Sequence, residues 1–264
     1  MYKAYQVHLA DHAVLADAEQ IEEMKRKNAA RVDIGNFVDD DGVLNGSEII
    51  DKWFPQGDFD VFISHSHADE TKALALSSYL ERKMGLKCFV DSCVWRYSDE
   101  ALRLLDNKFC TNSGSDPRTY CYDRRNITTT HVHNMLAVSL ASMMDKCECI
   151  FFLNSENSLE SKVSIANSAG NTTNSPWLYN ELNLCRILQK NVPDRHMWVS
   201  KASMEAMNEA RTDRQVPPFR YNVDIDYMTK LEFTDIVTWA HANNRLGLPS
   251  LDWLYSNYEM EFSA

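Results

Sequence analysis

The chain has 264 residues, a length that suits one large domain or one medium domain with an accessory piece. Hydrophobic residues make up 44% and charged residues 25% of it, which is typical of a packed globular protein and excludes a disordered or low-complexity chain. The formal net charge is -11, so nucleic acid and anionic membranes are not expected as partners.

The N-terminal segment and the cysteines indicate a cytoplasmic protein. The first residues, MYKAYQVHLADHAVLADAEQ, have acids where a signal peptide has its apolar region, and no run approaches the about 18 apolar residues of a membrane-spanning helix. The 7 cysteines include no C-x-x-C pair, and the short motifs His65-Ser66-His67 and His131-Val132-His133 lack a third ligand. We therefore expect reduced thiols, no membrane contact and no metal site.

Residues 1–57 are predicted to form an N-terminal helical extension that precedes the main fold. Between positions 11 and 32, Val14, Ala18, Ile21 and Met24 recur at helical spacing among charged neighbours. After Gly57 the pattern changes to strands that alternate with helices. We therefore place the main domain, with its insertions, at residues 58–264.

Five β-α units are predicted after Gly57. Strands are expected at residues 60–64, 86–90, 147–153, 196–200 and 221–225, and helices at 66–84, 98–109, 131–145, 176–190, 202–211 and 229–242. The polar stretch before His131 and residues 154–174 are predicted to be inserted loops. The helix at Pro176 has the clearest start, because Ser175 can cap it and proline favours the first helical position.

This alternation predicts an α/β fold with a flavodoxin-like, five-stranded parallel sheet. Right-handed crossovers place helices on both faces of such a sheet. In the common strand order 2-1-3-4-5, a crevice opens where the first and third strands end side by side. Residues 64–66 and the loop from Asn154 to the helix at Ser175 are therefore expected to line this crevice.

Glu181 is the candidate for chemistry on the helix that begins at Pro176. It shares one helical stripe with Trp177, Leu184 and Leu188, so the carboxylate lies among apolar positions. A carboxylate held in this way is partly desolvated, as acidic groups of active sites often are. A structural ion pair with an arginine is the alternative.

Four segments, in this order and spacing, resemble the successive boxes of a TIR (Toll/interleukin-1 receptor) domain. They are DVFISHS at 60–66 followed by Asp69, CFVD at 88–91, CIFFLN at 149–154 and SPWLYNEL at 175–182. The resemblance runs from about residue 58 to at least residue 188 and does not include residues 1–57. It implies the five-stranded parallel TIR fold with inserted loops.

Within this resemblance, Glu181 in S-P-W-x-x-x-E matches the glutamate that distinguishes NAD-cleaving TIR domains. The resemblance implies an enzyme that releases nicotinamide and makes ADP-ribose or a cyclic isomer of it, with Glu181 as the catalytic residue. The residues expected to bind NAD are Ser64, His65, Ser66, Asp91 and Trp177. NAD is the substrate, and no separate cofactor is expected. The alternative is a non-catalytic interaction module, as in many animal receptor and adaptor TIR domains.

Stand-alone TIR proteins with a short N-terminal extension resemble the sensor enzymes of bacterial anti-phage systems of the Thoeris type. This implies a phage-derived trigger and a separate effector protein that responds to the product. Residues 91–98 match the family's mobile loop and include Trp95, Arg96 and Tyr97, residue types enriched at interface hot spots. We expect self-association through this loop to activate the enzyme; packing of Trp95 in its own domain is the alternative.

Overall fold

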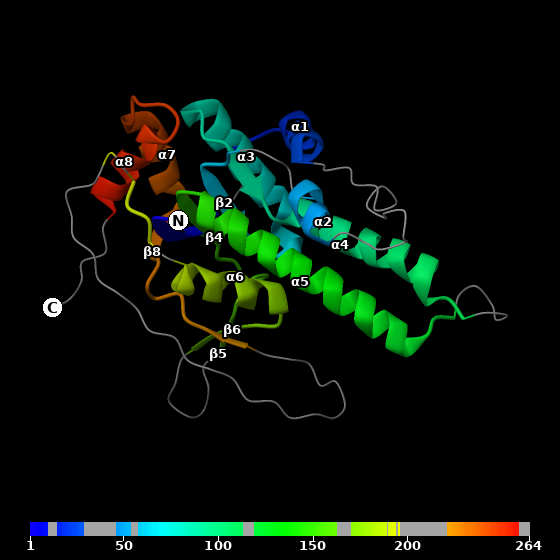
Figure 1. Ribbon diagram of the computed structural model, residues 1–264. Coiled ribbons are helices and arrows are strands. Elements are labelled where there is room, and N and C mark those ends of the chain that lie inside the picture. The colour runs from blue at the N-terminus through cyan, green and yellow to red at the C-terminus, as the bar shows by residue number, and fades with distance from the viewer. Residues whose placement is uncertain are drawn as a thin grey trace.

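The protein is built around a parallel β-sheet with helices on both faces, as the alternating pattern predicts (Figure 1). The structure, a computed structural model, describes residues 1–9, 15–28, 46–53, 58–112, 119–162, 170–188, 190–193, 195 and 221–258. Among these residues, no helix is both long enough and apolar enough to cross a membrane.

The sheet has five strands in the order β3-β2-β4-β1-β8, and every pairing between neighbours is parallel. The strands are β1 (Lys3–His8), β2 (Val61–Ser64), β3 (Cys88–Val90), β4 (Cys149–Leu153) and β8 (Thr229–Glu232). The three strands predicted first after Gly57 occupy adjacent positions in the expected 2-1-3 order. The flavodoxin-like, five-stranded parallel architecture is therefore as predicted.

The prediction that the first strand of the sheet follows Gly57 was wrong. β1 lies inside the sheet, where it pairs with β4 on one side and β8 on the other. Tyr5 and Val7 are fully buried, while Gln6 and His8 are half-buried. The first residues thus supply the fourth strand position instead of preceding the fold as a purely helical extension. The predicted N-terminal helix is present as α1 (Ala18–Asn28).

The last two predicted strands also need correction. Residues 196–200 and the helix predicted at 202–211 lie outside the described residues. β7 (Tyr221–Val223) is a strand, but it belongs to a small antiparallel sheet with β5 (Glu160–Lys162) and β6 (Gly170–Thr173), which occupy the predicted loop 154–174. The fifth strand of the main sheet is β8, where the start of a helix was predicted; α7 (Phe233–Ala242) follows it directly.

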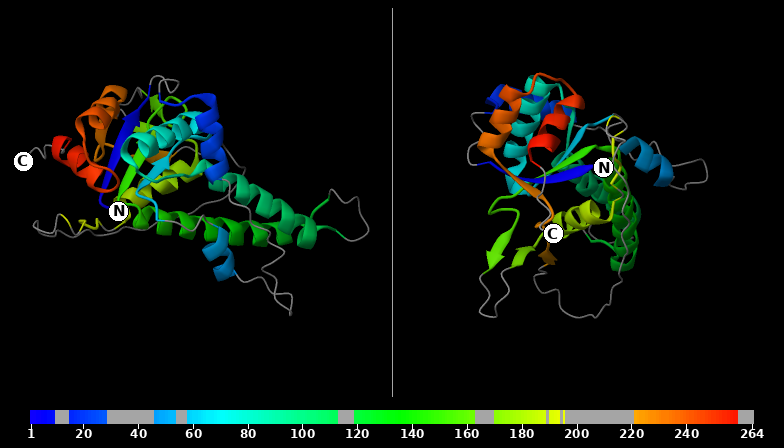
Figure 2. Two further views of the ribbon diagram at one scale, coloured as in Figure 1. Left: turned by 90° about the horizontal axis from the view of Figure 1, so that it is seen from above. Right: turned by 90° about the vertical axis from the view of Figure 1, so that its left-hand side faces the viewer.

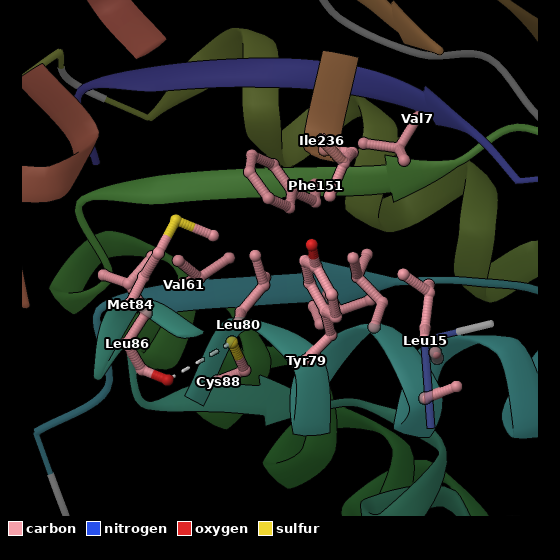
Figure 3. Close-up of a cluster of buried hydrophobic side chains, with 14 of the residues drawn as sticks. Val7, Leu15, Val61, Tyr79, Leu80, Met84, Leu86, Cys88, Phe151 and Ile236 are labelled. Carbon is pink, nitrogen blue, oxygen red and sulfur yellow. Dashed lines mark hydrogen bonds between the residues drawn. The ribbon is translucent and has the colours of Figure 1, made fainter. Parts of the chain in front are cut away.

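One face of the sheet is covered by α1, α3 (Glu70–Met84), α7 and α8 (Pro249–Asn257). In the core on this face, Val61, Leu80 and Phe151 lie between α3 and the sheet (Figure 3). α3 ends at Gly85, as predicted, because this residue adopts a left-handed conformation with φ of 66°. Burial of these apolar side chains fixes the helices of this face to the strands.

The other face is covered by α2 (Gly46–Trp53), α4 (Ser92–Leu105), α5 (Tyr122–Lys146) and α6 (Pro176–Ile187). Its core contains Phe62, Phe89 and Phe152 from the strands together with Leu136 and Leu182 from the helices. α4 and α5 run side by side and project beyond the sheet (Figures 1 and 2). Both begin earlier than predicted, and a π-helical turn, η3 (Asp106–Cys110), extends α4.

The predicted loop at residues 91–98 is therefore helical. α4 begins at Ser92, immediately after β3 and Asp91. The side chains of residues 93–97, including Trp95, Arg96 and Tyr97, lie outside the described ones. The short connection places the start of α4 at the carboxyl edge of the sheet, next to the end of β2.

Candidate active site

A pocket of about 490 Å³ opens at the carboxyl edge of the sheet. Residues that follow β2 and β3 line it together with residues of α4, α5 and α6. The lining side chains are His65, His67, Glu70, Asp91, Ser92, Ser98, Asp99, His133, Ser175, Trp177, Leu178 and Glu181. Its size is within the range of small-molecule sites, and polar groups converge on it from several elements. The pocket lies at the edge where an α/β sheet of this order is expected to bind ligands.

Glu181 reaches the pocket from the second turn of α6 and is only 1% exposed. The helix begins as predicted: Ser175 caps it by accepting a hydrogen bond from the N–H of Leu178, and Pro176 is its first residue. The hydroxyl of Ser64, at the end of β2, donates a 2.6 Å hydrogen bond to Oε2 of Glu181. Oε1 has no hydrogen-bond partner among the described residues. Glu181 is therefore held by one oxygen and free to interact with a ligand through the other.

Burial raises the pKa of Glu181 well above its ordinary value. The negative charge of Asp91 raises the pKa of Glu181 further, because a neighbouring negative charge disfavours ionisation of the carboxyl group, and the hydrogen bond from Ser64 opposes the shift only in part. Burial and the charge of Asp91 therefore favour the protonated form of Glu181. A cationic ligand beside it would favour the ionised form instead.

Asp91 and His65 form a buried pair that faces the same pocket. Nδ1 of His65 lies 2.6 Å from Oδ1 of Asp91, and the two side chains are 0% and 2% exposed. Burial by itself would lower the pKa of His65, but attraction to Asp91 outweighs it and raises the pKa. Nε2 of His65 has no partner among the described residues. The pair thus offers a second polar atom without a partner beside Glu181.

Trp177 and His133 form an aromatic part of the pocket wall. Their rings meet edge to face with centroids 5.3 Å apart, which joins the first turn of α6 to α5. Trp177 lies one turn before Glu181, so the indole and the carboxyl group line the same pocket. The site therefore combines a flat apolar surface with a buried acid.

The structure brings together four of the six residues that the sequence assigns to the site: Glu181, His65, Asp91 and Trp177 all line the pocket. Ser64 does not line the pocket, but its hydroxyl donates the hydrogen bond that positions Glu181. Ser66 is outside the lining and precedes the short helix η2 (His67–Asp69), which its side chain does not cap.

The loop after β4 was expected to line the crevice, but its first residues take another position. Ser155 and Asn157 bind the carboxylate of Asp69 instead, over 2.5 and 3.0 Å. Their hydrogen bonds fix the start of the loop to η2, and of the described residues from 154 to 175 only Ser175 lines the pocket.

Sequence reasoning missed the contributions of α4 and α5. Ser92, Ser98, Asp99 and His133 line the pocket. Three of these residues lie on α4, whose first turns were expected to be part of a loop at residues 91–98. His133 was considered only as a metal ligand. The polar residues directly after the second strand could have indicated this side of the site, because that strand also ends at the crevice.

The described residues contain no group of three or more His, Cys, Asp or Glu side chains placed to hold a metal ion. The described cysteines are free thiols: Cys88, Cys110, Cys121, Cys147, Cys149 and Cys185. Among the residues that the structure describes, the groups that the pocket offers for chemistry are therefore its acidic, histidine and aromatic side chains.

The chain matches no protein-family model, no curated protein and no solved structure. The chemistry of the pocket and the resemblance of the four sequence segments to TIR boxes are therefore the basis on which a function is assigned.

Proposed function

We propose that the chain is a TIR-type enzyme that cleaves NAD between nicotinamide and ribose. The observation that carries the proposal is the carboxyl group of Glu181, buried in a pocket at the carboxyl edge of the sheet with one oxygen unpartnered. It occupies the position at which the TIR resemblance expects the catalytic glutamate.

The charges around the pocket suit the nicotinamide end of NAD. The pyridinium ring is cationic, and the pocket presents the acids Glu181, Asp91 and Asp99. A cation beside Glu181 would lower its raised pKa, so substrate binding and ionisation of this carboxyl group support each other. Trp177 supplies a flat surface against which a planar ring can pack.

Cleavage breaks the bond between C1 of the ribose and the pyridinium nitrogen. The electron pair of this bond leaves with nicotinamide, which becomes neutral, and positive charge develops at C1. The ionised carboxylate of Glu181 stabilises this charge in a site that excludes water from the acid, where electrostatic interactions are strong. Attack by water at C1, with loss of a proton, gives ADP-ribose; attack by a nitrogen of the adenine gives a cyclic isomer.

The surrounding residues have positioning roles in this proposal. The hydroxyl of Ser64 fixes one oxygen of Glu181, which leaves the other to face C1 or a ribose hydroxyl. The pair of His65 and Asp91 offers Nε2 of the imidazole to the substrate. α4 and α6 both begin at the pocket, and N–H groups at helix starts favour the diphosphate of the same molecule.

We place this reaction in a cytoplasmic, bacterial anti-phage response in which a phage-derived trigger activates the enzyme and a separate effector responds to the product. Self-association through residues 91–98 is part of the same proposal. Ser92 and Ser98 belong to this segment and line the pocket, so contact with a neighbouring molecule at this segment would act directly on the site.

The test is release of nicotinamide from NAD, followed by chromatography across a range of protein concentrations. Wild type should release nicotinamide and Glu181→Ala should not, while Glu156→Gln, which removes an exposed carboxylate outside the pocket, should behave as wild type. Equal release by wild type and Glu181→Ala would refute the assignment. No release by wild type at any concentration or in infected-cell extract would favour the non-catalytic interaction module.

A further inference from the structure

A pair of cysteines lies far from the pocket, where the helical arm of α4 and η3 meets the start of α5. Cys110 is the last residue of η3, and Cys121 directly precedes α5. The N–H of Cys121 donates a 2.7 Å hydrogen bond to the carbonyl of Cys110, and Thr111 and Tyr120 form an antiparallel bridge beside it. The two cysteines therefore flank this isolated bridge and are joined by a main-chain hydrogen bond.

The 2.7 Å hydrogen bond between their main chains holds the two Cα atoms within about 6.5 Å of each other. This is inside the range of about 4.4 to 6.8 Å that disulfides span. We propose that Cys110 and Cys121 are a redox site that peroxide converts reversibly to a disulfide.

Arg124 makes the surroundings of the pair electropositive. Its guanidinium donates to the carbonyls of Phe109 and Thr111, on both sides of Cys110, over 3.0 and 2.9 Å. The backbone N–H of Arg124 and its guanidinium also lower the pKa of Cys121. Cys121 is half-buried and so reachable by solutes, which makes it the thiol that reacts first.

Cys110 has the properties of the second thiol. It is buried, and burial raises its pKa, so it stays protonated while Cys121 reacts. Its sulfur lies 3.7 Å from the hydroxyl of Thr128, which in turn donates a 2.9 Å hydrogen bond to the carboxylate of Asp106. This chain of contacts provides a route for the proton that Cys110 must lose.

The reaction proceeds in two steps. The thiolate of Cys121 attacks one oxygen of hydrogen peroxide, and the O–O bond breaks. Cys121 becomes a sulfenic acid, and the hydroxide that leaves is protonated to water. Cys110 then gives up its thiol proton through Thr128 toward Asp106, and its sulfur attacks the sulfur of Cys121. The S–O bond breaks, and the hydroxide that leaves takes up one proton from solvent, in place of the one that Cys110 released, to become the second water. Overall, two thiols are oxidised and one peroxide is reduced to two waters.

The remaining described cysteines lack these features. Cys88, Cys147, Cys149 and Cys185 are buried in the two cores, and burial raises the pKa of Cys147 to about 12. They serve as internal controls in the same molecule. The disulfide would join the outer ends of two helices whose inner parts carry Asp99 and His133 of the pocket. The redox site formed by the two cysteines does not depend on NAD cleavage.

The first experiment oxidises the reduced full-length protein with a small excess of hydrogen peroxide and maps the cysteines by mass spectrometry. The mass should fall by about 2 Da through loss of two hydrogens, and trypsin should yield residues 109–118 linked to residues 119–124. A thiol reductant should reverse both changes. A first bond between any other two cysteines, or oxidation of Cys121 without a link to Cys110, would overturn the proposal.

Two variants assign the roles of the thiols. In Cys110→Ser, Cys121 should accumulate as a sulfenic acid that dimedone traps, and in Cys121→Ser, Cys110 should stay reduced at the same dose. In Arg124→Gln, the pH midpoint of alkylation of Cys121 should move upward, because the guanidinium is lost. An unchanged midpoint, or rapid oxidation of Cys110 without Cys121, would contradict the assigned roles.

Discussion

Asp69 and Glu181 are both 1% exposed and both lie at the carboxyl edge of the sheet, but their surroundings differ. Asp69 accepts hydrogen bonds from Ser155 and Asn157 and pairs with Lys72 over 2.8 Å. Glu181 accepts one hydrogen bond, from Ser64, and lies beside a second acid, while its other oxygen has no partner in the part of the chain that the structure describes.

The two carboxyl groups therefore shift in opposite directions. Burial would raise the pKa of Asp69, but its three donors outweigh burial and lower it. Burial and Asp91 raise the pKa of Glu181. Equal burial thus has opposite consequences: a fully partnered carboxylate stabilises a loop, whereas an under-partnered one costs stability and is available to a ligand.

Asp69→Asn should produce the largest change in stability. The amide nitrogen would face donors that now bind the carboxylate, so at neutral pH the free energy of unfolding should fall by about 2 to 3 kcal/mol. Chemical denaturation measures this change. Asp58→Asn, at an exposed position, is the control and should stay within about 0.5 kcal/mol of wild type. A loss of similar size in both variants would show that the network around Asp69 is unimportant.

Glu181→Gln should stabilise the protein. The amide has nearly the shape of the carboxyl group, keeps an acceptor for Ser64 and avoids the cost of ionising a buried acid beside Asp91. We expect a gain of about 1 kcal/mol at neutral pH, because replacing a buried ionisable group by a neutral one of the same shape is often stabilising. A destabilised variant would mean that Glu181 is a structural group like Asp69.

The effect of pH should separate the two sites further. Asp69 has a lowered pKa, so its contribution is present above the unfolded pKa of about 4 and is lost as pH falls through the folded pKa. Glu181 has a raised pKa, so its protonated form favours folding near pH 4 and this benefit is lost as pH rises. Relative to wild type, Glu181→Gln should therefore gain stability as pH rises, whereas Asp69→Asn should lose stability as pH rises. A change of the same sign in both variants would contradict this account.

Ser64→Ala should have the smallest effect, a change in pH profile with little change in stability. Loss of the hydrogen bond removes the contact that lowers the pKa of Glu181, so this pKa should rise further. If NAD cleavage needs the ionised carboxylate, the acidic limb of the kcat/KM profile should move to higher pH. Ser64→Thr, which keeps a hydroxyl, should restore it in part; a profile identical to wild type in Ser64→Ala would remove Ser64 from this role.

Much of the site was predictable because its signals are local. The apolar runs of β2, β3 and β4 and the Ser175-Pro176 start of α6 each identify their element within a few residues. Once α6 is placed, helical spacing puts Trp177 and Glu181 on one face.

The parts that were not predictable depend on tertiary contacts. β1 alternates buried Tyr5 and Val7 with half-buried Gln6 and His8, so it does not resemble the buried, mostly apolar strands β2, β3 and β4. The first turns of α5 contain Asn126, Ile127 and a run of threonines, which are poor helix formers. Packing against α4 and η3 overrides this preference, so the helix begins well before the predicted start.

The most direct test of the central claim measures nicotinamide release and unfolding in the same samples of wild type, Glu181→Gln and Asp69→Asn. The account predicts that Glu181→Gln is at least as stable as wild type but loses about 100-fold or more in kcat/KM, while Asp69→Asn is less stable yet keeps most of its activity per folded molecule. If Glu181→Gln keeps wild-type activity, or loses it only in proportion to unfolding, Glu181 is not the group that cleaves NAD.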